Sequence, residues 1–87
     1  MEVAVWDTWV KRSDGRLMNF DIIVPRTFTD ATKIFSFGTE YLASKGMQGK
    51  LLSSAECRFC HVQVALPEWI SQIKELGYYI CELQGCE

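Results

Sequence analysis

A short segment near the middle of the chain, Cys57-Arg58-Phe59-Cys60-His61, carries side chains that can do chemistry. Two thiols separated by two residues can attach haem c, bind a soft metal or exchange disulfides, and an imidazole beside them can complete such a site. His61 is the single histidine of the chain, and Cys86 near the C-terminus is a further thiol. These residue types define three chemical hypotheses.

Haem c attachment requires export and a second axial ligand to the iron. The N-terminal residues MEVAVWDTWV include Glu2 and Asp7 and have no basic segment before an apolar one. We therefore expect no signal peptide, and the haem hypothesis lacks its context.

Zinc is the leading metal hypothesis. A structural zinc site needs four ligands, and the predicted set is Cys57, Cys60, His61 and Cys86. The prediction requires the C-terminal tail to return to the other two thiols. On this hypothesis the protein is a non-catalytic binding module with a soft-metal site.

The second hypothesis is a thiol redox enzyme that uses Cys57 and Cys60. Cys57 would then lie on a helical turn that begins at Ser53 or Ser54, and Arg58 would favour its thiolate. In the plainest alternative, the thiols do no chemistry and Cys60 fills the core.

That alternative follows from the period of two in a strand. It places Cys60 in the core with Val62 and Val64, whereas His61 lies on the other face with Phe59 and Gln63. Free cysteine is among the most frequently buried residue types, which favours this packing role.

The elements that position these residues follow from periodicity and turn signals. The expected strands are Val3–Val10, Leu17–Val24, Phe59–Ala65 and Tyr78–Leu83, and the expected helices are about Asp30–Lys45 and Pro67–Leu76. Gly38 in the first helix is expected to allow close approach to the sheet. The ββαβαβ order predicts an α+β two-layer sandwich, a four-stranded mixed sheet with both helices on one face. The last two strands, joined by a helix, are expected to be parallel.

The first two strands are predicted to form a hairpin with the three-residue loop Ser13-Asp14-Gly15, in which Gly15 takes a left-handed conformation. This register is preferred because it gathers apolar side chains on one face. That face consists of Ala4, Trp6, Thr8, Val10, Met18, Phe20, Ile22 and Val24.

The same register places Asp7 and Asp21 opposite each other on the other face. Like charges in that position repel, so we expect a bound cation, Lys11, Arg26 or water to relieve them. One raised pKa in such a pair would also permit acid–base chemistry.

Several apolar residues accompany these acids, namely Val3, Val5, Trp9, Leu17 and Ile23. An apolar patch of this kind marks contact with another protein chain or a ligand groove, or else it is covered by residues 47–56. The simplest partner is a second copy, so an interaction module that forms a homodimer through this face is a further hypothesis.

The chain has 87 residues, a length that predicts one domain. Its net charge is −2. Its basic residues form no stripe, so nucleic-acid binding is not expected. No window approaches about 20 apolar residues, so we expect no membrane span and a cytoplasmic location. Reduced thiols are typical of that compartment.

Four segments of the chain, VWDTWVKRSDGRLMNFDIIV, EYLASKG, SSAECRFCH and GYYICELQGCE, closely resemble a family of small bacterial proteins known as domain of unknown function number twenty twenty-four. The most specific matches fall on Glu56, Cys57, Cys60, His61, Gly85 and Cys86. The resemblance implies a single compact α/β domain, typical of structural-genomics targets, without an established activity, substrate or cofactor. It makes the three cysteines and the histidine the group to test.

Overall fold

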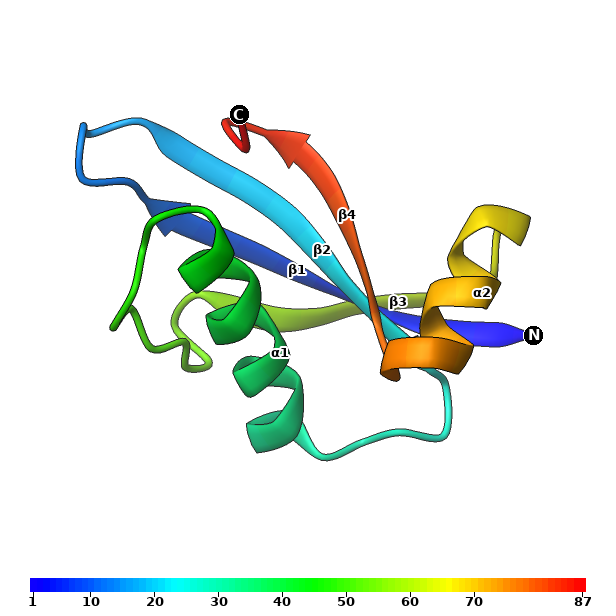
Figure 1. The fold of residues 1–87 in the computed structure, drawn as a ribbon. Helices are drawn as coiled ribbons and strands as arrows, with labels where there is room; N and C mark the ends of the chain where they lie inside the picture. Colours follow the sequence, from blue (N-terminus) through cyan, green and yellow to red (C-terminus); the bar gives the residue numbers. More distant parts are fainter.

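A computed structural model describes residues 1–87 and contains four strands and two helices (Figure 1). In chain order they are β1 (Glu2–Lys11), β2 (Leu17–Pro25), α1 (Ala31–Ser44), β3 (Cys57–Val64), α2 (Pro67–Leu76) and β4 (Tyr79–Gln84). The N-terminus lies beside α2, at the end of β1 that is far from the β1–β2 turn, whereas the C-terminus lies on the side of that turn.

The four strands form one open sheet in the order β3-β1-β2-β4, and every neighbouring pair is antiparallel. The predicted mixed sheet is therefore wrong, as is the expectation that the last two strands run parallel to each other. The β1–β2 hairpin occupies the centre, so β3 and β4 each add at one free edge, antiparallel to the hairpin strand they join. They consequently lie at opposite edges of the sheet.

The predicted hairpin register is confirmed. Asp7 pairs with Asp21 across β1 and β2, and the ladder ends with the Arg12 amide donating to the Arg16 carbonyl at 2.8 Å. The three loop residues lie between these arginines, and Gly15 has φ of 88°. A residue with a Cβ is strained in that conformation, which explains why glycine stands there.

The two helices cover opposite faces of the sheet, so the predicted two-layer sandwich with both helices on one face is wrong. We name the inner face as the one that α1 covers; it carries Ala4, Val10, Met18, Phe20, Ile22 and Val24. The outer face carries Val3, Val5 and Ile23, which are buried beneath Trp69 and Ile73 of α2. An apolar cluster on both sides of the hairpin requires a cover on both sides.

Local sequence signals mark the start of α1 and both ends of α2. Asp30 caps α1 by accepting a hydrogen bond from the Lys33 amide at 3.1 Å, and Pro67 opens α2. Gly77 ends α2 in a left-handed conformation. Neither helix combines the length and the apolar character that crossing a bilayer requires.

Gly38 generates a testable prediction about packing. A Cβ at this position would lie 2.8 Å from Ile22 Cδ1 and would also collide with Leu52, so the expected close approach to the sheet is confirmed. Gly38→Ala gains about 1 kcal/mol of helix propensity but overpacks a buried contact, which typically costs about 1–3 kcal/mol. We expect the free energy of unfolding of Gly38→Ala, measured with urea, to be lower than that of the wild type by about 1 kcal/mol.

The matched control is Ser36→Ala on the exposed side of the same helix, which we expect to change the free energy of unfolding by no more than about 0.5 kcal/mol. A Gly38→Ala protein more stable than the wild type would show that the contact has room to spare.

Candidate functional site

A β-bulge in β3 determines where the Cys-x-x-Cys-His segment points. Phe59 pairs with Trp6 and His61 pairs with Val5, so Cys60 is an extra residue without a partner on β1. Phe59 therefore shares the inner face with Trp6, at 6.0 Å between ring centroids, whereas His61 shares the outer face with Val5. The predicted burial of Cys60 in the core is wrong, because its side chain is exposed. The predicted shared face of Phe59 and His61 is wrong as well.

The four predicted zinc ligands do not converge in this arrangement. Cys57 and Cys86 are buried in the inner core, whereas Cys60 and His61 are exposed. The Cys86 thiol donates to the Asn19 carbonyl of β2 at 3.4 Å, so about two strand spacings, on the order of 10 Å, separate it from Cys57 on β3. No three His, Cys, Asp or Glu side chains are grouped as a metal site requires. Zinc binding by this set stays a prediction.

The Cys57 thiol is poorly placed to be a redox nucleophile. The predicted helical turn does begin at Ser53, whose carbonyl accepts a hydrogen bond from the Cys57 amide at 3.0 Å. The Cys57 side chain nevertheless turns into the core, where burial raises the pKa of its thiol. A reactive thiol needs the opposite shift, so the geometry does not support Cys57 and Cys60 as a disulfide-exchange pair.

Cys60 has a different neighbour. Its Sγ lies 3.3 Å from Nδ1 of His61, and Nε2 of His61 lies 2.7 Å from Oε1 of Gln63. Sequence reasoning placed Gln63 on the same face as His61 but assigned it to no site. The signal for its contact with His61 is the spacing of two residues, which puts both side chains on the outer face of one strand.

The outer face also carries the predicted carboxylate pair. Asp7 of β1 lies directly opposite Asp21 of β2. Asp7 accepts hydrogen bonds from the Trp9 indole at 3.1 Å and from the Asn19 amide at 2.9 Å, and the same amide also donates to the Thr8 carbonyl. These donors hold the Asp7 carboxylate in a defined orientation.

The electrostatics of the two acids differ. Partial burial raises the pKa of Asp21, and the neighbouring charge of Asp7 raises it further, whereas a positive charge on His61 opposes both effects. No lysine or arginine forms an ion pair with either acid; Arg26, one of the expected partners, binds Glu2 instead at 2.8 Å. Arg58 of β3 pairs opposite Asp7 in the sheet, but its guanidinium donates to the Ser54 carbonyl at 3.1 Å, so neither carboxylate of the pair forms a salt bridge.

The surroundings of the acids are mixed in character. Trp9 and Leu17 remain exposed, at 42% and 52%, although the other apolar residues of the predicted patch lie beneath α2. The expected cover by residues 47–56 is not what buries those residues. A small pocket of about 280 Å³ lies beside Asp7 and is lined by Asp7, Trp9, Ala55, Glu56 and Arg58.

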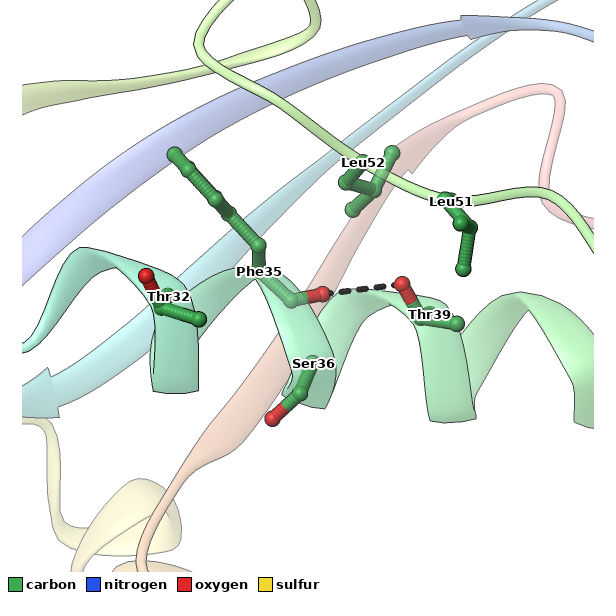
Figure 2. A pocket seen from close by; sticks show the side chains of 6 residues that line it. All are labelled: Thr32, Phe35, Ser36, Thr39, Leu51 and Leu52. Atoms are coloured by element: carbon green, nitrogen blue, oxygen red, sulfur yellow. Dashed lines mark hydrogen bonds between the residues drawn. The ribbon is translucent and has the colours of Figure 1, made fainter.

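A second pocket lies on the other side of the molecule, between α1 and the segment that follows it (Figure 2). Its volume is about 260 Å³, and its lining is Thr32, Phe35, Ser36, Thr39, Leu51 and Leu52. The hydroxyls of Thr39 and Ser36 donate to carbonyls of their own helix. With these two donors already paired, we interpret this pocket as a packing groove.

With this geometry in place, comparison with known proteins adds family membership. The family model described as a domain of unknown function (DUF2024) matches residues 1–83. The chain belongs to the DUF2024 family. It is similar to protein NE1680 from Nitrosomonas europaea, a structural-genomics target solved by NMR, with 40% identity, a TM-score of 0.85 and coverage of 100% of each chain. A comparison with curated proteins found no match.

Family membership confirms the predicted resemblance and brings no activity with it, so function is argued from the outer face.

Asp21 supplies the first test of that face. Because folding raises its pKa above the ordinary 3.8, its contribution to stability is complete below that value and is lost as the pH rises through the folded-state pKa. The side chain that Asp21→Asn introduces does not ionise, so the variant does not lose this stability. In urea unfolding, the free energy of unfolding of the variant should therefore rise relative to that of the wild type between about pH 3 and pH 7.

Asp14→Asn is the matched control with the opposite sign. Hydrogen bonds from the Arg16 amide and side chain lower the pKa of Asp14, so its contribution is present at neutral pH and is lost on acidification. A constant stability difference between Asp21→Asn and the wild type across this range would contradict the prediction.

Proposed function

We propose that this protein is a non-catalytic binding module that recognises a cationic side chain of a protein partner through the uncovered half of its outer sheet face. The observation that carries the proposal is the Asp7–Asp21 pair, two facing carboxylates without a lysine or arginine partner of their own. All four cysteines are free thiols, as is typical of proteins in a reducing compartment, and we propose a cytoplasmic location.

The energetic argument starts from repulsion. Two unit charges about 5 Å apart near a protein surface interact by about 3 kcal/mol at an effective dielectric constant of about 20. Like charges directly opposite on neighbouring strands are unfavourable for this reason. An ammonium or guanidinium group placed against both Asp7 and Asp21 converts that repulsion into two attractions. Protonation of Asp21 relieves the same strain when no cation is bound.

The neighbours of the pair favour an organic cation over a hard metal ion. Calcium and magnesium require several oxygen ligands, whereas the side chains next to Asp7 are N–H donors from Trp9 and Asn19. The exposed surface of Trp9 and the side chain of Leu17 suit the methylene stem of a lysine or arginine. Tryptophan is enriched at protein–protein interfaces, so an exposed Trp9 beside the acids suits a protein partner.

The test is an NMR titration of ¹⁵N-labelled protein with butylammonium and with propylguanidinium, with 1-butanol as the uncharged control probe. We expect both cations to shift the Trp9 indole and Asn19 side-chain amide signals, and 1-butanol to leave them unchanged. The probe that binds more tightly identifies a lysine or an arginine as the recognised side chain.

Asp21→Asn removes one carboxylate and should weaken binding of the better probe by about tenfold, which corresponds to about 1.4 kcal/mol. Asp14→Asn, which removes an acid from the hairpin loop, should leave the affinity unchanged. Equal affinity of the wild type and Asp21→Asn would refute the proposed site.

Light scattering distinguishes two alternative partners of this face: a second copy of the chain, as in the predicted homodimer, and a different protein. A homodimer that uses this face would convert to monomer in Trp9→Ser, and butylammonium would compete with dimer formation. A monomer that still binds the cationic probes would indicate a different protein partner.

The soft-metal hypothesis retains one supporting contact, the 3.3 Å approach of Cys60 Sγ to His61 Nδ1. These atoms are two of the four ligands that a structural zinc site needs. We therefore expect protein purified without chelator to contain less than one zinc per chain by elemental analysis. Stoichiometric zinc that disappears in Cys86→Ser would show instead that the tail completes the predicted set.

A further inference from the structure

We propose that Cys60 is a nucleophilic thiol that forms mixed disulfides with low-molecular-weight disulfides such as oxidised glutathione, with His61 as its base and Gln63 as the residue that orients His61. The proposal rests on the β3 edge and does not depend on cation binding by Asp7 and Asp21.

The bulge makes Cys60 accessible. Cys60 is the unpaired extra residue of β3, and β3 is an edge strand with no neighbour on its far side. Its side chain is exposed, so an attacking sulfur at this position can be reached by a small disulfide in solution. Bulges commonly re-aim a side chain in this way.

The contacts of Gln63 define the proton arrangement. Its Nε2 donates to the Val64 carbonyl at 3.4 Å, which turns Oε1 toward His61. Oε1 is an acceptor, so Nε2 of His61, at 2.7 Å, carries the hydrogen. In the neutral ring the lone pair then resides on Nδ1, the nitrogen that lies 3.3 Å from Cys60 Sγ. A nucleophile, a base and a residue that orients the base are thus aligned along one strand.

The other three cysteines provide an internal contrast. Cys57 and Cys86 are buried in the inner core, and the Cys86 thiol donates to a backbone carbonyl. Cys81 is half-buried opposite Asp21, and its burial and that neighbouring carboxylate raise the pKa of its thiol. None of the three has an imidazole partner. We therefore expect modification to select Cys60.

The reaction is a thiol–disulfide exchange. His61 accepts the Cys60 proton, and the thiolate attacks one sulfur of the small disulfide. The new S–S bond to Cys60 forms as the original S–S bond breaks, and the released thiolate takes the proton from His61. No second thiol is placed to resolve the adduct, because Cys57 is buried in the core. The mixed disulfide therefore persists until a small thiol reverses the exchange.

The experiment follows reaction of the folded, full-length chain with oxidised glutathione by intact mass and peptide mapping. We expect one adduct per chain, on Cys60, removed by reduced glutathione. Cys60→Ser should abolish it, and Cys81→Ser should react at the wild-type rate. An adduct that forms first on Cys57, Cys81 or Cys86 would overturn the proposal.

The role of His61 is tested with His61→Gln, which keeps a polar side chain of similar size, and the role of Gln63 with Gln63→Leu. Near neutral pH we expect the rate to fall at least about tenfold in the first variant and by a smaller factor in the second. The difference should narrow as the pH rises, because hydroxide can accept the thiol proton in place of His61. Equal rates for wild type and His61→Gln at neutral pH, in a variant with unchanged urea unfolding, would overturn the assignment.

Discussion

The register of the β1–β2 hairpin is the constraint on which both faces of the molecule depend. Side chains alternate along a strand, so a slip by one residue would exchange the two faces of one strand. Asp21 would then face α1, and buried residues such as Phe20 and Ile22 would turn to the outer face. The three-residue loop prevents this slip, because Gly15 adopts φ of 88° and Asp14 accepts a hydrogen bond from the Arg16 amide. A short loop therefore determines which side chains α1 and α2 bury.

Sequence reasoning succeeds wherever the deciding interactions are local. The hairpin loop, the start of α1 near Asp30, the bounds of α2 and the facing carboxylates all follow from spacings of a few residues. Burial along α2 is less regular: Trp69 and Ile73 are buried, whereas Leu66, which precedes the helix, is 44% exposed. Periodicity identifies a helix face but does not identify how far the sheet extends beneath it.

Non-local choices could not be predicted in the same way. Nothing in the spacing of β3 and β4 indicates which edge of the hairpin each strand joins, and the zinc hypothesis depended on that choice. The bulge at Cys60 inserts one residue into a pattern that otherwise reads as simple alternation, and it moved Phe59 to the face opposite His61. One signal was present in the sequence: Val3, Val5 and Ile23 lie together on the outer face at the end of the hairpin far from its turn. Such a cluster requires a cover, and α2 is that cover.

The outer face is divided at the acidic pair. On one side of it α2 excludes water from an apolar cluster, and on the other side Trp9 and Leu17 remain exposed. Asp21 lies at this border and is partly buried, whereas Asp7 is held by two N–H donors. Burial disfavours the charged form of Asp21, so a proton and an external cation relieve the same repulsion and compete for the same place. Cation binding at this pair must therefore strengthen as the pH rises through the folded-state pKa of Asp21, which distinguishes it from attraction to the overall negative charge of the chain.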